Sequence, residues 1–216
     1  MKRLILGFFS LILFAGVSAQ SKAKYPLDAE GNCEIIDTID INVTNSDCYR
    51  IIKEWLYTKS CVSLSFSNEK KNQSLTFNNV FYIQKRYNSF SGTYSDNLSI
   101  DCDMKIEGSK LIYRIYHINM IKSYVGYDAT ASVYPVAERI HKINSAQSVI
   151  DRVNQDKTLS KADKRDILDD QKEILAYDEV LVKSYNVLME RFSDLKKMVQ
   201  WSQESTDDDT EEVPFP

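Results

Sequence analysis

The stretch LSIDCDMKI, residues 98–106, decides the fold of this chain. Apolar and polar residues alternate along it without a break, and this period of two is typical of a β-strand that buries one face and exposes the other. The turn-like segment EGSK, residues 107–110, then leads into a second strand over residues 111–121, so the two strands form a hairpin. Apolar residues fall on both faces of the second strand, which predicts a central position in a sheet or a cover on both sides.

Strand patterns also precede this hairpin. Apolar residues alternate with polar ones over residues 35–43 and 62–67, and residues 75–87 are rich in aromatic and apolar side chains. The polar residues 68–72 and the small polar residues 89–97 are typical of connections. We therefore expect an antiparallel sheet of about five strands.

Helical spacing marks two further segments. Cap residues at 45–47 precede residues 47–59, whose apolar side chains fall on one helical face. A long helix begins at Ser160, where Asp163 completes a pattern similar to a capping box, and we expect a bend or break near residues 176–179. Along this helix, apolar residues recur every seven positions: Ile167, Ile174, Leu181, Leu188 and Leu195.

This apolar stripe has two interpretations. The helix packs across the apolar face of the sheet, or it forms a coiled coil with a second copy. We favour packing within the chain, because polar residues such as Asp170 and Ser184 interrupt the second seam of the heptads. Residues 124–143 are irregular and rich in Tyr, and Pro135 breaks any helix there. The prediction is an α+β fold, a curved antiparallel sheet of about five strands with helices packed on one face, including the long C-terminal helix.

The ends of the chain predict an exported protein. Residues 1–19 combine Lys and Arg, a run of about a dozen apolar residues and the small-residue pattern VSA, which are the parts of a cleaved signal peptide. A membrane span needs about 20 apolar residues, and no later stretch reaches that length. We therefore predict a flexible leader over residues 20–32, a single domain over 33–202 and an acidic disordered tail over 203–216. After cleavage near Ala19 the chain is expected to be soluble, in the periplasm or secreted.

Composition and motifs exclude several classes of function. The 216 residues include 27 Lys and Arg against 31 Asp and Glu, whereas general nucleic-acid binders need cations to neutralise phosphates. The chain lacks phosphate-binding glycine loops, the GxSxG elbow of serine hydrolases and the ligand spacings of zinc sites. We therefore predict no catalytic residue, no cofactor, no metal site and no nucleic-acid partner.

The four cysteines, Cys33, Cys48, Cys61 and Cys102, leave two possibilities open. In an exported chain an even number of cysteines can form two disulfides, and buried thiols can equally fill positions in the core. A bond between Cys48 and Cys61 is disfavoured, because the helix expected between them would hold them about 20 Å apart.

Four segments carry a resemblance to a known family: EIIDTIDINV (34–43), SDCYRIIKEWL (46–56), LIYRIYHINM (111–120) and VLMERFSDLKKMVQW (187–201). With them the chain resembles exported bacterial domains of unknown function that have a fold like that of the TATA-binding protein. The resemblance implies the fold for most of the chain and lends no activity and no functional residue. DNA binding is not implied, because fold does not carry function and this chain is acidic.

The leading hypothesis is a non-catalytic binding or interaction module of the periplasm or cell envelope, whose partner is an envelope protein or a glycan. Tyr combines an apolar ring with a hydroxyl, which suits interfaces and contacts with sugars. The candidate contact residues are therefore Tyr124, Tyr127 and Tyr134. This hypothesis predicts an exposed aromatic or apolar patch on the open face of the sheet or within residues 124–143.

Two alternatives stand beside it. A hydrolase of glycan or cell-wall material would use paired carboxylates, for which Asp101 and Asp103 on one strand face are candidates. A structural protein would self-associate through its C-terminal helix. Because we assign the stripe of that helix to packing within the chain, we expect a monomer.

Overall fold

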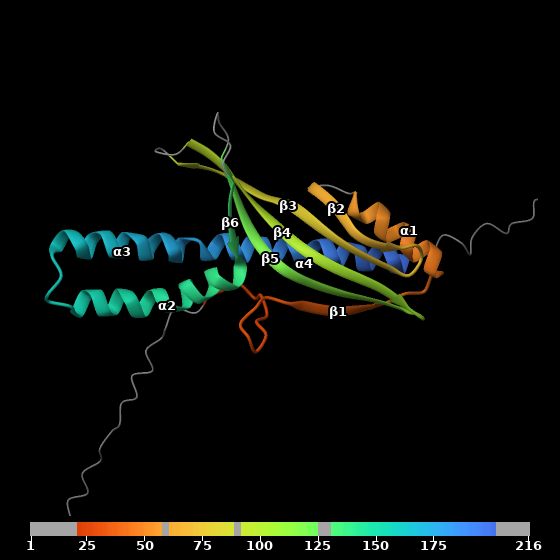
Figure 1. Cartoon of the computed structure of the whole chain (residues 1–216), viewed down its shortest axis with the longest axis horizontal. Coiled ribbons are helices and arrows are strands. Elements are labelled where there is room, and N and C mark those ends of the chain that lie inside the picture. Colours follow the sequence, from red (N-terminus) through yellow and green to blue (C-terminus); the bar gives the residue numbers. More distant parts are fainter. Residues whose placement is uncertain (1–20, 58–60, 89–91, 125–130, 202–216) are drawn as a thin grey trace, which may run out of the picture.

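The computed structural model describes residues 21–57, 61–88, 92–124 and 131–201. Its centre is an antiparallel sheet with the strand order β1-β5-β4-β3-β2, and β6 pairs with the same edge of β5 as β1, farther along that strand (Figure 1). The strands are β1 (Ile35–Asp40), β2 (Cys61–Lys70), β3 (Ser74–Asn88), β4 (Gly92–Glu107), β5 (Lys110–Tyr124) and β6 (Ala131–Pro135).

The sheet has six strands in the described part of the chain, where the sequence analysis predicted about five. The additional strand, β6, lies in the segment 124–143 that was expected to be irregular. Strand β4 begins at Gly92, so residues 92–97 pair with β3 and are not the connection that their composition suggested. Strand β4 therefore continues through polar and aromatic residues beyond the apolar part from which it was predicted, whereas β6 is a separate short strand.

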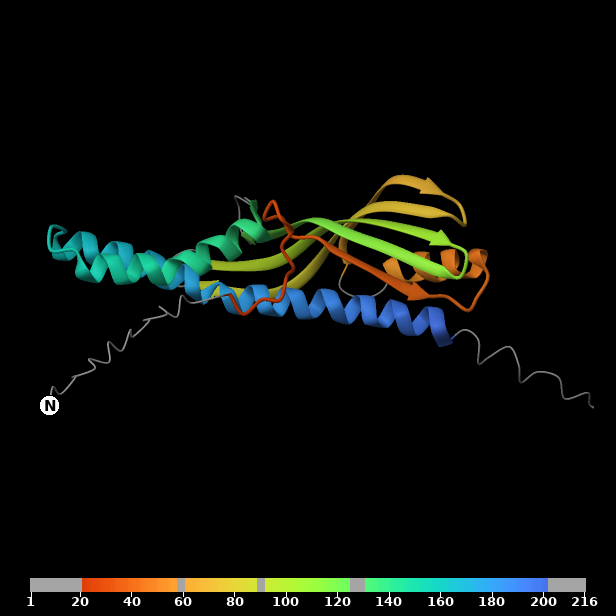
Figure 2. The ribbon, with the colours of Figure 1, turned by 90° about the horizontal axis from the view of Figure 1, so that it is seen from below.

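Two helices cover one face of the sheet, and two others extend past its end (Figure 1, Figure 2). Helices α1 and α4 lie on the same side of the sheet and contact each other, as the predicted one-sided cover requires. Helices α2 and α3 pack side by side as an antiparallel pair that projects away from the sheet. The helices are α1 (Asn45–Leu56), α2 (Val136–Gln155), α3 (Lys161–Ala176) and α4 (Asp178–Trp201).

The long C-terminal helix is divided in two. The side-chain oxygen of Ser160 caps α3 by accepting a hydrogen bond from the backbone N–H of Asp163 at 3.2 Å, and the helix breaks at Tyr177, within the range predicted for a break. The heptad stripe of α4 is buried in the core of the chain, with both Leu181 and Leu188 fully inaccessible, which agrees with packing within the chain. Helix α3 buries no residue, so the stripe does not serve the core along its whole length.

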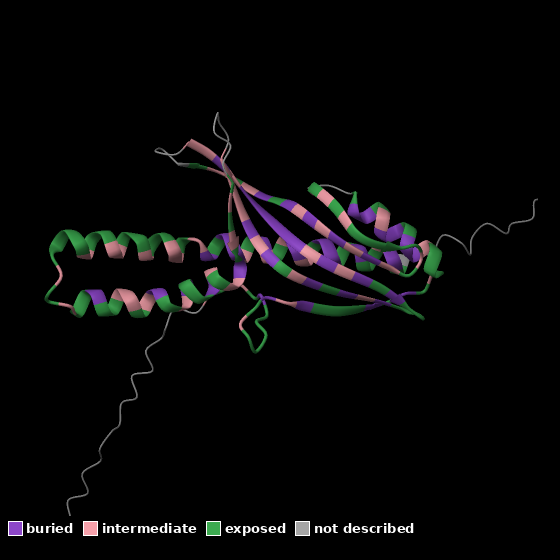
Figure 3. Ribbon diagram, viewed as in Figure 1, coloured by how far each residue is buried: buried purple, intermediate pink, exposed green. Residues whose placement is uncertain are grey.

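The core confirms the strand from which the fold was predicted. Every apolar residue of the 98–106 stretch lies in β4 and is buried, with at most 7% of its surface exposed (Figure 3). From α1, the Trp55 ring packs edge-on against Phe192 of α4 at 5.1 Å, and its indole N–H donates to the carbonyl oxygen of Arg191 at 2.9 Å. The helices therefore meet each other as well as the sheet, and one continuous core results.

A bulge explains the mixed pattern of β5. Before the bulge Tyr113 and Ile115 face the core, and after it Ile118 and Met120 do, because the register shifts by one residue at His117. His117 has a φ of 46°, which is uncommon for a residue other than Gly and lets the strand take up the extra residue. Strand β5 is central, as predicted, but only one of its faces is covered by helices.

The described part of the predicted leader packs on the domain. Tyr25 is 5% exposed, its ring meets that of Tyr185 at 5.0 Å, and its hydroxyl is 2.9 Å from that of Ser184. Nearby, the Asp178 carboxylate accepts hydrogen bonds from the hydroxyl of Ser21 at 2.6 Å and from the next backbone N–H at 3.0 Å. This segment is anchored by burial and hydrogen bonds that its polar sequence does not reveal.

The four cysteines are free thiols. Cys33, Cys48 and Cys102 are buried, and burial raises the pKa of Cys33 to about 12 and that of Cys48 to about 11. This arrangement corresponds to the possibility of thiols filling the core. The predicted signal peptide and the acidic tail lie outside the described residues, and no helix in the described part is long and apolar enough to cross a membrane.

Candidate functional site

At one end of the sheet, the face that elsewhere carries the apolar core carries charged and aromatic residues instead. On β4, Tyr94 and Asp96 continue the parity of Leu98 and are buried with it. The register pairs Tyr94 with Arg86 of β3 and Asp96 with Lys122 of β5. Because directly paired residues project from the same face of a sheet, all of these side chains point to the side on which the helices lie.

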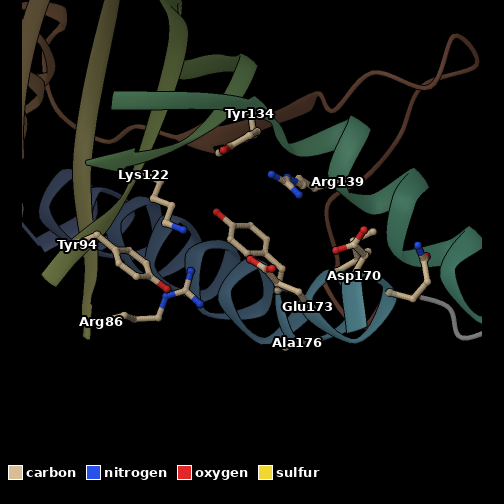
Figure 4. A pocket seen from close by; sticks show the side chains of 11 residues that line it. Arg86, Tyr94, Lys122, Tyr134, Arg139, Asp170, Glu173 and Ala176 are labelled. Carbon is tan, nitrogen blue, oxygen red and sulfur yellow. The ribbon is translucent and has the colours of Figure 1, made fainter. Parts of the chain in front are cut away.

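Helices α2 and α3 and strand β6 complete a cleft over this polar end of the sheet (Figure 4). The cavity has a volume of about 490 Å³. Asp170 and Glu173 of α3, both exposed, stand at its rim. We call it the cation–tyrosine cleft, after the three cations and three tyrosines that line it: Arg86, Lys122, Arg139, Tyr94, Tyr134 and Tyr177.

Tyr177, at the break between α3 and α4, lies between two of the cations. The guanidinium carbon of Arg86 is 5.5 Å from the centre of its ring and that of Arg139 is 5.1 Å away. Arg139 also lies over the ring of Tyr134 at 4.0 Å. Such cation–π contacts contribute from about 0.5 kcal/mol when exposed to about 2 kcal/mol when desolvated. They hold the guanidinium groups in place without neutralising their charge.

The ring of Tyr94 makes a cation–π contact with the third cation, Lys122. The ammonium nitrogen of Lys122 is 4.2 Å from its ring centre, and the guanidinium carbon of Arg86 is 4.9 Å away. Tyr124 adds a ring that is 5.9 Å from that of Tyr94 and 5.3 Å from the ammonium of Lys122. Cations and rings therefore alternate through the cleft in the order Tyr134, Arg139, Tyr177, Arg86, Tyr94, Lys122 and Tyr124.

The three cations differ in how their charge is balanced. Arg86 donates two hydrogen bonds to the fully buried carboxylate of Asp96, at 2.6 and 3.0 Å. Burial alone would lower the pKa of Arg86, but the hydrogen bonds and the charge of Asp96 outweigh it and raise that pKa. Among the ion pairs of the described residues, none includes Lys122 or Arg139. Two cations of the cleft therefore have no fixed counter-ion in the described part of the protein.

The Tyr177 hydroxyl is a further unused group. It is buried and has no hydrogen-bond partner in the described structure. Burial raises the pKa of Tyr177 to about 12, with a smaller contribution from Asp96, so the hydroxyl stays protonated at neutral pH. It is thus a neutral donor on a residue that lines the cleft.

The three predicted contact residues do not lie together in the structure. Tyr134 lines the cleft, Tyr124 lies beside it through Lys122, and Tyr127 is outside the described residues. The three cations, Tyr94 and Tyr177 are not among the contact residues predicted from the sequence. One signal was available, because the alternation of 98–106 extends back to Tyr94 and Asp96 with the same parity.

Asp101 and Asp103, the carboxylates proposed for a hydrolase, lie on the opposite, open face. Asp101 accepts a hydrogen bond from the amide of Asn78 at 2.9 Å and lies 2.8 Å from Nδ1 of His117. Asp103 accepts one from the hydroxyl of Tyr116 at 3.3 Å. A second cavity of about 620 Å³ is lined by Asp101 and His117 and not by Asp103, so the two carboxylates do not share it. No cluster of three or more metal-ligating side chains occurs within the described ranges.

Comparisons with known proteins report similarity in structure only. No family model and no curated protein matches the chain. A DUF4468 family protein from Bacteroides ovatus ATCC 8483 is 12% identical, with a TM-score of 0.45, over 82% of this chain and 92% of its own. A TBP-like protein from Parabacteroides distasonis ATCC 8503 is 12% identical, with a TM-score of 0.44, over 81% of this chain and 96% of its own. Both names agree with the family that the sequence resembles, bacterial domains of unknown function with a fold like that of the TATA-binding protein.

Proposed function

We propose that the protein is an exported, non-catalytic binding module of the periplasm or cell envelope that holds its ligand in the cation–tyrosine cleft. The observation that carries this proposal is the pair of cations, Lys122 and Arg139, that tyrosine rings hold in the cleft without a carboxylate partner. Cations in a partly buried site cost free energy unless an anion offsets them. The carboxylates at the rim form no ion pair with these cations in the described structure, so an anionic group of a ligand can pair with both.

The location of these charges supports the same proposal. The face of the sheet that carries Tyr94 and Asp96 is the face that elsewhere forms the apolar core, so apolar residues there would pack without any electrostatic cost. The cavity of about 490 Å³ falls in the range of about 300–1,000 Å³ that is common for small-molecule sites. Of the two expected partners, a glycan fits such a cleft better than the flat surface of a folded protein.

A fragment screen tests this function without knowledge of the natural ligand. Backbone amide shifts of the isotope-labelled mature chain would be recorded against a few hundred small fragments. Since preformed binding sites collect fragments of many kinds, we expect the shifted amides to gather around Arg86, Lys122, Arg139 and Tyr177. The variant Lys122→Gln/Arg139→Gln should lose the anionic fragments, whereas Lys105→Gln on the open face should keep them. Fragments that gather in the cavity beside His117, or nowhere, would refute the proposal.

A second candidate, hydrolysis at the open face, has one observation in its favour. The Asp101 carboxylate next to Nδ1 of His117 would orient the ring and leave Nε2 free to act as a base. If this pair is catalytic, Asp101→Asn and His117→Gln should each abolish glycan hydrolysis, while Asp103→Asn should leave it intact. If Asp101→Asn and His117→Gln hydrolyse glycans as fast as the unsubstituted chain, this candidate is excluded.

A further inference from the structure

The charges around the cation–tyrosine cleft form two groups with different chemistry. Lys122 and Arg139 come from β5 and α2, whereas the carboxylates Asp170 and Glu173 both come from α3 (Figure 4). In the described structure no ion pair joins the two groups. A bound molecule therefore meets cations from β5 and α2 and carboxylate acceptors from α3.

From this arrangement we propose that the ligand is an acidic saccharide, a hydroxyl-rich sugar unit with a single carboxylate. This inference rests on the proposed binding function of the cleft and names its ligand class. The planar guanidinium of Arg139 can hold a carboxylate through two parallel hydrogen bonds, with Lys122 as a second donor. The sugar hydroxyls donate to Asp170 and Glu173, which as carboxylates can only accept hydrogen bonds.

The same carboxylates argue against a simple polyanion. Asp96 already balances Arg86, so the charges left in the cleft are two cations and the two carboxylates of Asp170 and Glu173. A phosphate or sulfate with two charges would be attracted by Lys122 and Arg139 and repelled by the rim. A carboxylate with one charge takes the paired hydrogen bonds of Arg139, and the neutral hydroxyls of the sugar donate to Asp170 and Glu173, which a phosphate or sulfate dianion cannot do.

The cleft is also built to present fixed donors. Arg139 lies between the rings of Tyr134 and Tyr177, and Lys122 lies over Tyr94, so the side chains are ordered before a ligand arrives. Ordering of flexible cations in advance reduces the entropy that binding has to overcome. The Tyr177 hydroxyl, buried and without a hydrogen-bond partner in the described structure, belongs to a residue of the same wall.

Calorimetric titration of the mature chain tests the ligand class with defined probes. The acidic probes are galacturonate, glucuronate, N-acetylneuraminate and N-acetylmuramate, each with one carboxylate. Galactobiose and N-acetylglucosamine are the neutral probes, and orthophosphate and inositol hexakisphosphate are the simple anions. We expect at least one acidic sugar to bind at least tenfold more tightly than every neutral sugar and than orthophosphate.

The variants separate recognition of a sugar from attraction to any anion. Arg139→Gln should weaken the acidic sugar at least tenfold. Asp170→Ala/Glu173→Ala should also weaken the acidic sugar, because the acceptors for its hydroxyls are lost, yet strengthen orthophosphate and inositol hexakisphosphate, because repulsion is lost. Arg165→Gln, an exposed residue of α3 whose partner is Asp166, is the control and should leave all affinities unchanged.

The outcomes also separate this inference from the binding function on which it rests. If orthophosphate or a neutral sugar binds more tightly than every acidic sugar, or if the rim variant strengthens the acidic sugar, the ligand class is wrong. If no sugar binds while fragments still gather in the cleft, the ligand class is wrong and the binding function stands. If fragments do not gather there, the binding function itself fails.

Discussion

The buried carboxylate of Asp96 allows a quantitative test of how the cleft is built. Asp96 is fully inaccessible, whereas the Arg86 side chain that it binds is 30% exposed. The substitution Asp96→Asn keeps the shape and removes the charge. Loss of one partner from a buried ion pair costs about 3–5 kcal/mol, because the other charge is left uncompensated. Since water can solvate part of Arg86, we expect the lower figure of about 2–3 kcal/mol.

Urea and thermal unfolding followed by circular dichroism would measure this cost. For a chain of this size, about 2–3 kcal/mol corresponds to a fall in Tm of about 4–12 °C. Asp103→Asn on the open face is the matched control and should change the free energy of unfolding by less than about 0.5 kcal/mol. Arg86→Gln with Asp96→Asn should cost less than the sum of the single changes. If Asp96→Asn costs no more than Asp103→Asn, Asp96 does not hold Arg86 and the account of the cleft is wrong.

Three further predictions follow from contacts outside the cleft. Asp178→Ala removes the acceptor for Ser21 and Lys22, so we expect a loss of about 1–3 kcal/mol in unfolding free energy and faster amide exchange over residues 21–25. Burial raises the pKa of Cys48 from its ordinary 9.0 to about 11. The buried thiol therefore contributes fully to the free energy of unfolding below pH 9, and this contribution is lost as the pH rises through 11. At pH 10.5 the free energy of unfolding should be about 2 kcal/mol lower because of this thiol. A chain with Cys48→Ala should therefore lose less stability between about pH 8 and 10.5 than the unsubstituted chain. His117→Gly relieves the strain of a φ of 46° and loses one exposed hydrogen bond, to Asp101. It should raise the free energy of unfolding by about 0.5–1 kcal/mol. A fall in that free energy would show that the His117 side chain holds the bulge.

The main elements of the fold could be predicted because their sequences record one-sided burial. The alternation over residues 98–106 specifies β4, and the spacing of apolar residues over 47–59 specifies α1, since both elements bury one face in the same core. Helix α2 could not be predicted in the same way. It buries few residues because it packs mainly on α3, and Pro135 stands directly before its start, where a proline is tolerated.

The cleft could be predicted only in part. The parity of Tyr94 and Asp96 with Leu98 shows from the sequence alone that two polar residues face the core side of the sheet. Nothing local in the sequence indicates that Arg139 and Tyr177 meet them, because these residues arrive from α2 and from the end of α3. Such a site is created by topology, and local periodicity carries no record of it.

The inner face of the sheet thus serves two purposes along its length. From Leu98 to Ile106 it packs on α1 and α4, and this part supplies the apolar burial on which the stability of a small domain depends. From Gly92 to Asn97 the same face lies next to α2 and α3 and carries groups that add electrostatic cost. A domain tolerates such a cost only where the remaining core is sufficient, and violations of local packing rules concentrate at functional sites. The separation of core and cleft along one face is therefore the physical reason that we propose a binding site at the polar end of this sheet.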